Sequence, residues 1–140
     1  MKILLAVDGS PYTKKMLAYV TTHTELFSGD HDFTLLAVQT PLPARARSAV
    51  GKEAVDAYYV EEAAKVLEPA LKFMSRHELK CKGMSKVGAV GETVAKTAES
   101  GHFDMLIMGS HGHSALGSLV MGSVTTNVLA HCSVPVLLIR

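Results

Sequence analysis

Five short apolar segments, each of strand length, alternate along this chain with segments in which apolar residues recur at helical spacing. The apolar segments occupy residues 2–7, 33–38, 80–87, 104–108 and 134–139. Most of them are apolar at consecutive positions, as strands buried on both faces of a sheet are. This alternation predicts an α/β fold, a three-layer structure in which helices cover both faces of an open, five-stranded parallel sheet.

Helices are expected between these strands, at residues 11–27, 53–76, 91–100 and 118–131. Ser10 and Pro11 are suited to begin the first helix, because a serine side chain caps a helix N-terminus and proline fits the first helical position. Pro69 is expected to kink the second helix. Residues 40–52, between the second strand and that helix, are predicted to form a mobile basic loop.

The composition fits one domain that spans residues 1–140. Hydrophobic residues make up 48% of the chain and charged residues 19%, which is ordinary for a globular protein. The formal net charge of +1 gives no reason to expect a nucleic acid or an acidic membrane surface as a partner. The apolar segments are much shorter than the roughly 18 residues of a membrane-spanning helix, and no secretory leader is recognisable, so we expect a cytoplasmic protein.

Two cysteines, Cys81 and Cys132, lack both the CxxC spacing of a metal site and the density of a disulfide framework. We expect them to be buried or half-buried free thiols. The histidines are not spaced as metal ligands either, and no metal site is predicted.

A glycine-rich segment follows the fourth apolar segment and leads into the last expected helix. Its spacing is G-x2-G-x9-G-S, formed by Gly109, Gly112, Gly122 and Ser123. Glycine permits backbone conformations that are closed to other residues, and it allows the backbone to approach a ligand closely. The N–H groups and dipole at the start of the following helix, together with the Ser123 hydroxyl, are suited to bind phosphate oxygens. Such a site would lie beyond the carboxyl ends of the strands, where Asp8 also ends the first strand.

The same sequence excludes two common classes of nucleotide site. It contains no GxxxxGK[ST] phosphate-binding loop, and no GxGxxG follows the first strand. No G-x-S-x-G elbow surrounds a serine nucleophile. Because the lysine and arginine residues that phosphoryl transfer usually requires are missing from this segment, no catalytic residue is predicted.

Several segments together resemble the small, single-domain members of the universal stress protein family. They are Val7-Asp8-Gly9-Ser10, Gly91-Glu92, Asp104-Met-Leu-Ile-Met-Gly109, the glycine segment, and Ser133-Val-Pro-Val-Leu-Leu-Ile139. The resemblance implies a Rossmann-like fold of the adenine nucleotide alpha-hydrolase type. Some members of this family bind ATP and others do not, and the intact glycine spacing marks those that bind. The resemblance therefore implies the ATP-binding branch, with ATP, ADP or AMP as the ligand and Mg²⁺ as a candidate companion.

Carried over position by position, the resemblance gives nine residues a nucleotide-binding role. Asp8 and Ala6 would line the nucleotide at the end of the first strand, although some family members have proline in place of Ala6. Val38 would offer its backbone to the adenine. The ribose and phosphates would be held by Met108, Gly109, Gly112, Gly122, Ser123 and Val124. The family also pairs through its last strand, which implies a homodimer through a strand that begins at Val134 and ends at Ile139.

Some residues keep alternative roles open. Asp8 could contact Mg²⁺ or the ribose, or could serve only at the start of the following helix. His111 and His113 could donate to phosphate or transfer a proton, or they could face solvent without fixed chemistry. Arg45 and Arg47 could fold over a bound triphosphate or belong to a solvated charged loop.

Three functions remain open from the sequence. The first is a nucleotide-binding stress or regulatory module whose occupancy is read by a protein partner, and this is our prediction. The second is a slow ATP hydrolase, in which Asp8 holds Mg²⁺ and His111 or His113 assists a water. The third is a dimerising interaction domain with an unoccupied cleft, or a receiver-like signalling fold. A receiver is disfavoured because Asp8 alone follows the first strand, where receivers gather several carboxylates.

Overall fold

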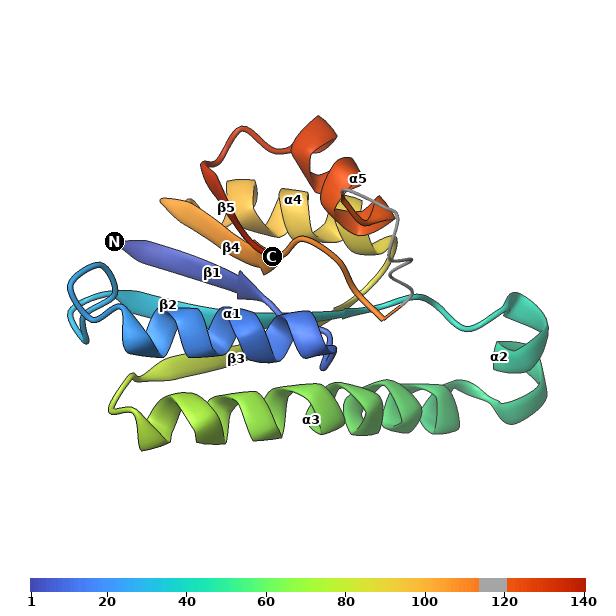
Figure 1. Ribbon diagram of the computed structural model, residues 1–140. Coiled ribbons are helices and arrows are strands. Elements are labelled where there is room, and N and C mark those ends of the chain that lie inside the picture. The colour runs from blue at the N-terminus through green and yellow to red at the C-terminus, as the bar shows by residue number, and fades with distance from the viewer. Residues whose placement is uncertain (114–120) are drawn as a thin grey trace.

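Five parallel strands form one sheet, in the order β3-β2-β1-β4-β5, in the computed structural model, which describes residues 1–113 and 121–140 (Figure 1). The strands are β1 (Lys2–Ala6), β2 (Asp32–Gln39), β3 (Cys81–Val87), β4 (Met105–Gly109) and β5 (Val136–Ile139). The helices are α1 (Pro11–Thr22), α2 (Ala44–Val50), α3 (Lys52–Arg76), α4 (Val90–Ser100) and α5 (Ser123–His131). The direction of the strand order reverses between β1 and β4, so the connections that follow these two strands lead to helices on opposite faces of the sheet and leave a crevice between them.

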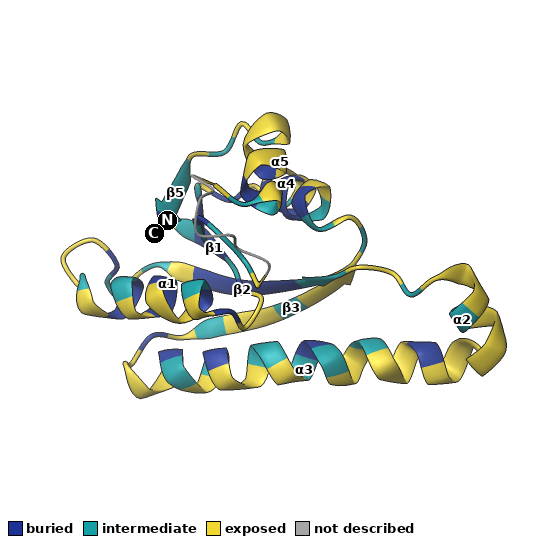
Figure 2. Cartoon of the chain, turned by 45° about the vertical axis from the view of Figure 1, so that its right-hand side comes forward, coloured by how far each residue is buried: buried dark blue, intermediate teal, exposed yellow. Residues whose placement is uncertain are grey.

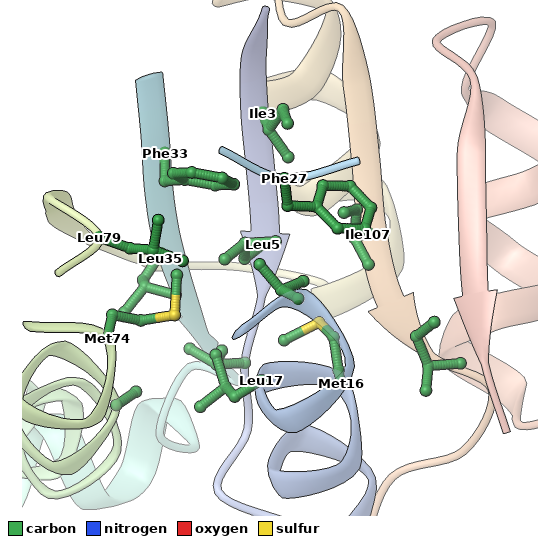
Figure 3. Close-up of a cluster of buried hydrophobic side chains, with 14 of the residues drawn as sticks. Ile3, Leu5, Met16, Leu17, Phe27, Phe33, Leu35, Met74, Leu79 and Ile107 are labelled. Carbon is green, nitrogen blue, oxygen red and sulfur yellow. The ribbon is translucent and has the colours of Figure 1, made fainter. Parts of the chain in front are cut away.

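Alternating side chains of the central strands supply two separate cores, one on each face of the sheet. Ile3 and Leu5 of β1 face α1 and α3, whereas Leu4 between them faces α4 and α5. Figure 3 shows the first core, in which Met16 of α1 and Met74 of α3 approach the strands. Figure 1 shows the two helical layers, with α1 and α3 on one face of the sheet and α4 and α5 on the other. The predicted three-layer α/β fold is confirmed.

α1 is shorter than predicted, because it ends at Thr22 instead of continuing to Phe27. His23 follows the helix, and both its backbone N–H and its Nδ1 bond the Tyr19 carbonyl oxygen, at 3.1 Å and 2.9 Å. Phe27 is nevertheless buried, with 3% of its surface exposed, because a turn carries it back to the core. The apolar periodicity therefore continued past the true end of the helix.

The mobile loop predicted for residues 40–52 is wrong, since residues 44–50 form α2. Pro43 precedes the helix, and Gly51 ends it with φ +83°. None of the residues of α2 is buried, and the helix projects beyond the sheet (Figure 2). Arg45 and Arg47 lie on this helix.

Smaller differences concern the other element boundaries. Pro69 lies inside α3, which continues on both sides of it. β5 begins at Val136 rather than Val134, because Pro135 has no N–H to donate, although its carbonyl oxygen accepts from Leu106 N–H at 2.9 Å. The predicted start of the last helix at residue 118 lies outside the described residues, and α5 begins at Ser123. In the part of the chain that the structure describes, no helix is both long and apolar enough to cross a bilayer.

Candidate functional site

The turn that follows β1 holds the Asp8 carboxylate at the carboxyl edge of the sheet. Gly9 has φ +76°, a left-handed conformation that favours glycine. The turn brings Ser10 to the N-cap of α1, where its Oγ accepts a hydrogen bond from Thr13 N–H at 3.3 Å. Asp8 Oδ1 accepts hydrogen bonds from Ser10 N–H at 2.9 Å and from the Thr13 hydroxyl at 2.8 Å. The predicted cap at Ser10 and helix start at Pro11 are confirmed.

Hydrogen bonds also hold the start of α5 against the end of β4. Ser110 N–H donates to the Ile139 carbonyl oxygen at 2.9 Å, and Gly122 N–H donates to the Ser110 carbonyl oxygen at 2.8 Å. The buried Thr125 hydroxyl lies 3.2 Å from the Gly109 carbonyl oxygen and 3.1 Å from that of Ser110. The N-terminus of α5 is thereby fixed beside the end of the sheet.

The glycines of this segment are needed for space rather than for unusual backbone conformations. Among the described residues, the left-handed glycines lie elsewhere in the chain, so that part of the sequence argument is wrong. A Cβ on Gly109 would stand 2.6 Å from the Cβ of Tyr12, and a Cβ on Gly112 would stand 2.9 Å from Asp8 Oδ2. These glycines let the segment pass close to α1 and to the Asp8 carboxylate.

A cavity of about 250 Å³ opens between these two groups of residues. One wall, from β2 and α4, is apolar and consists of Leu36, Val38, Val90 and Val94. The opposite wall comes from the end of β4, the residues after it and the first turn of α5. The N-cap residue Gly122 makes no side-chain capping hydrogen bond among the described residues, and the first turn of α5, with its N–H groups and positive dipole, borders the cavity.

All nine residues predicted from the sequence line this one cavity. They are Ala6, Asp8, Val38, Met108, Gly109, Gly112, Gly122, Ser123 and Val124. Two further described lining residues, His111 and His113, had alternative roles from the sequence. The other described lining residues had none; they are Val7, Thr13, Leu36, Val90, Val94 and Thr125. Thr13 could have been recognised as the first-turn residue of a helix that starts beside Asp8, whereas Val90 and Val94 carry no local signal because packing of α4 brings them here.

The two histidines of the segment have fixed partners. The Nδ1 of His111 lies 2.9 Å from Ser110 Oγ, and its ring lies 5.0 Å from the Tyr12 ring. The Nε2–H of His113 donates to the Asp8 carbonyl oxygen at 2.6 Å, which ties the segment after β4 to the end of β1. His111 is partly buried and His113 is exposed. These contacts hold the imidazoles within the protein but assign them no chemistry, so both roles named for them from the sequence stay predictions.

The charged groups of the cavity are few. Asp8 is the only acidic residue among the described lining residues, and no lysine or arginine is found among them. In the described part of the chain, no group of three or more His, Cys, Asp or Glu side chains is arranged to hold a metal ion. Arg47 instead lines a separate surface hollow together with Tyr59 and Val87. The cavity therefore offers mainly backbone N–H groups, hydroxyls and imidazoles to an anionic ligand.

Comparison with known proteins places the chain in a family. The profile of the universal stress protein family matches residues 1–140. The chain belongs to the universal stress protein family. Among its relatives, Universal stress protein Slr1230 of Synechocystis is 32% identical over 139 residues, which cover 99% of this chain and 42% of that protein. A universal stress protein of Thermus aquaticus is 30% identical over 142 residues, which cover 99% of this chain and 97% of that protein. The chain thus spans less than half of the first relative and nearly all of the second.

Solved structures share the fold of this universal stress protein domain. The structure of MJ0577 superposes with a TM-score of 0.81 at 31% identity, and the match covers 99% of this chain and 94% of the MJ0577 chain. A universal stress protein family protein of Arabidopsis thaliana, solved with AMP bound, superposes with a TM-score of 0.69 at 16% identity, covering 99% and 90%. The universal stress protein of Archaeoglobus fulgidus in complex with dAMP gives 0.68 at 18% identity, covering 100% and 98%.

Both cysteines of this universal stress protein domain are half-buried free thiols, as predicted. Burial raises the pKa of the Cys81 thiol to about 12, with a smaller contribution from the nearby Asp32 carboxylate. Burial also raises the pKa of the Cys132 thiol. Neither cysteine lines the cavity, and raised pKa values make both poor nucleophiles.

Proposed function

We propose that this universal stress protein domain binds an adenine nucleotide in the cavity between the ends of β1 and β4. The observation that carries the proposal is the convergence of all nine sequence-predicted residues on one cavity, next to the open N-terminus of α5. Helix N-termini and glycine backbones bind phosphate through N–H groups and the helix dipole. The AMP and dAMP named for two neighbours of the same fold support the adenine nucleotide class.

Each part of the ligand has a matching wall. The phosphates are assigned to Gly109, Gly112 and the start of α5, where anions are favoured. The adenine is assigned to the apolar wall of β2 and α4, with the Val38 backbone at its edge. The ribose is assigned to Asp8, whose carboxylate borders the segment that holds the phosphates.

ATP is the proposed ligand, and ADP and AMP are its alternatives. Mg²⁺ fits this assignment because protein sites commonly hold it through one or two carboxylates together with the phosphates of the substrate. Asp8 is the carboxylate available for this purpose among the described cavity residues. The ion would neutralise phosphate charge in a cavity whose described lining contains no lysine or arginine.

The proposed role is regulatory, in the stress response for which the family is named. We also propose that the protein resides in a reducing compartment such as the cytoplasm, because both of its cysteines are free thiols. Nucleotide occupancy would change the surface that a protein partner reads. Phosphoryl transfer usually relies on lysine or arginine to stabilise the charge of the transition state, and neither lines the described cavity. This favours binding over the slow ATP hydrolase, in which Asp8 and either His111 or His113 would act.

A homodimer through β5 is part of the proposal. The two edges of the sheet differ, because β3 carries exposed Lys82 and Lys86, whereas β5 is uncharged and has half-buried Leu137 and Leu138. Exposed lysines on an edge strand protect it from pairing with another chain. An unguarded apolar edge therefore favours β5 as the pairing strand. A dimerising domain with an empty cleft is the corresponding alternative.

The test is calorimetric titration of ATP with Mg²⁺ into the wild-type protein and into a Gly122→Ala, Ser123→Ala double variant. A Cβ at position 122 would stand 3.3 Å from the His111 Cα, and the second change removes the Ser123 hydroxyl. Gly29→Ala is the matched control, because the nearest atom to its new Cβ is the Glu78 carbonyl oxygen at 3.9 Å, far from the cavity.

We expect micromolar binding by the wild-type protein and by Gly29→Ala, and loss of binding in the double variant. An absence of binding by the wild-type protein would favour the dimerising domain. Phosphate release by wild-type protein, abolished by Asp8→Ala, would instead favour the hydrolase.

A further inference from the structure

The Asp8 carboxylate presents its two oxygens to different surroundings. Oδ1 accepts hydrogen bonds from Ser10 N–H and from the Thr13 hydroxyl, at 2.9 Å and 2.8 Å. Oδ2 lies beside Gly112, close enough that a Cβ there would stand 2.9 Å from it. No hydrogen bond reaches Oδ2 from any residue that the structure describes. One oxygen of the carboxylate is therefore held by the protein, and the other is left at the cavity.

The hydroxyl of Thr13 bonds Asp8 in both directions. It donates to Asp8 Oδ1 at 2.8 Å and accepts from Asp8 N–H at 3.0 Å. Thr13 N–H donates in turn to the Ser10 Oγ at 3.3 Å, which fixes Thr13 in the first turn of α1. Thr13 is 6% exposed and Ser10 is fully buried, whereas Asp8 itself is exposed, so water reaches the carboxylate but has little access to the groups that hold it. The rotation of the Asp8 side chain is thus held by two groups, the Ser10 N–H and the buried Thr13 hydroxyl.

From this geometry we propose that Thr13 is a positioning residue of the nucleotide site, and that it turns Asp8 Oδ2 toward a hydroxyl group of the ligand sugar. The inference rests on the proposed function and goes beyond it by naming the group that sets the direction of the carboxylate. Thr13 lines the cavity, but its hydroxyl is committed to Asp8. Its effect on the ligand therefore passes through Asp8.

The test compares two ligands that differ only in the sugar hydroxyls, ATP and 2′,3′-dideoxy-ATP, by calorimetry. Thr13→Val keeps the branched shape and the backbone N–H but removes both hydrogen bonds to Asp8. Thr13→Ser keeps the hydroxyl. Thr21→Val is the matched control, because Thr21 is also a buried threonine of α1 and its hydroxyl bonds the Leu17 carbonyl oxygen, away from the cavity.

We expect Thr13→Val to weaken ATP binding roughly tenfold, as the loss of a hydrogen bond to a charged group does, and to leave dideoxy-ATP binding unchanged. Thr13→Ser and Thr21→Val are expected to bind both ligands as the wild-type protein does. In an Asp8→Ala background, Thr13→Val should have no further effect on ATP binding.

Each other result would overturn the inference in a recognisable way. If Thr13→Val weakened the binding of ATP and of dideoxy-ATP equally, Thr13 would only support the shape of the cavity. Unchanged ATP binding by Thr13→Val, or equal affinity of the wild-type protein for both ligands, would remove the link from Thr13 to a sugar hydroxyl while leaving nucleotide binding in place. A wild-type protein that binds neither ligand would overturn the proposed function itself.

Discussion

At Gly112, adding a single methyl group should weaken ligand binding without disturbing the fold. Its φ is not in the left-handed region, so alanine can adopt the same backbone conformation. The added Cβ would stand 2.9 Å from Asp8 Oδ2, the oxygen that the protein leaves at the cavity. We expect Gly112→Ala to weaken ATP binding by about tenfold through this contact.

Calorimetry measures the change in binding, and urea unfolding with Gly29→Ala as the control measures stability. A Gly112→Ala variant that binds ATP as tightly as the wild-type protein would show that Asp8 and this part of the segment do not act together on the ligand.

Cys81 should make the stability of the protein depend on alkaline pH. Burial raises the pKa of its thiol from an ordinary value of 9.0 to about 12 in the folded state. Between these values the unfolded thiol has lost its proton while the folded thiol keeps it, so the free energy of unfolding falls as the pH rises from about 9 to about 12.

The measurement is the difference in free energy of unfolding between wild-type protein and Cys81→Ala, at pH 8 and at pH 10.5. The Cys81→Ala variant lacks the titrating thiol and serves as the reference. The stabilising contribution of the thiol, measured as this difference, should be smaller at pH 10.5 than at pH 8. A difference that stays constant over this interval would contradict the raised pKa.

At the scale of elements, one carboxylate joins the end of α4 to the connection between α5 and β5. Glu99 Oε1 accepts hydrogen bonds from both the N–H and the hydroxyl of Ser133, each at 2.6 Å. These bonds lower the pKa of Glu99 below its ordinary value of 4.5. The lowered pKa means that the stabilisation is present above about pH 4.5 and is lost as the pH falls through the folded-state pKa.

We therefore expect Glu99→Gln to lower the Tm at pH 7 and to have a smaller effect at pH 3.5. Glu25→Gln is the control, because Glu25 is exposed and has no hydrogen bond or ion pair through its side chain in the described part of the chain. Equal Tm decreases at both pH values would indicate that the charge of Glu99 is not involved.

The elements also show where sequence periodicity succeeds and fails. Periodicity detects a helix through its buried face, and α2 has no buried residue, so the sequence pattern gave no sign of it. The opposite error occurred after Thr22, where the buried Phe27 continued the periodic pattern although His23 had already ended α1. β3 was predicted correctly to within one residue, even though its lysines dilute the apolar pattern.

At the scale of the whole molecule, the unequal edges of the sheet predict the oligomeric state. We expect sedimentation velocity to show a dimer with twice the mass of the chain. Leu137→Lys, on β5, should convert it to a monomer by placing a charge on the pairing edge. Ser85→Lys, on the exposed β3, is the matched control and should remain a dimer.

Circular dichroism of both variants checks that the sheet remains folded, because Leu137 also packs against the first core. A wild-type protein that sediments as a monomer at all concentrations, or a Ser85→Lys variant that alone becomes monomeric, would contradict pairing through β5.

The sequence by itself determined the kind of fold and the place of Asp8 and the glycine segment, whereas Ala6, Val38, Met108 and Val124 were assigned only through the family resemblance. Apolar strands that alternate with helices require a covered parallel sheet, and the glycine segment after β4 and Asp8 after β1 must then lie at its carboxyl edge. These are local consequences of hydrophobic burial and chain direction, so they can be deduced from the residues in order.

Only the tertiary structure decided which groups meet across the crevice. The strand order places β4 beside β1, and the packing of α4 then brings Val90 and Val94 to face the segment after β4. The hydrogen bonds of Thr13 with Asp8 depend on the geometry of the turn at Gly9 that joins β1 to α1. These contacts join segments distant in sequence or depend on the geometry of a turn, and neither is encoded in the periodicity of any one segment.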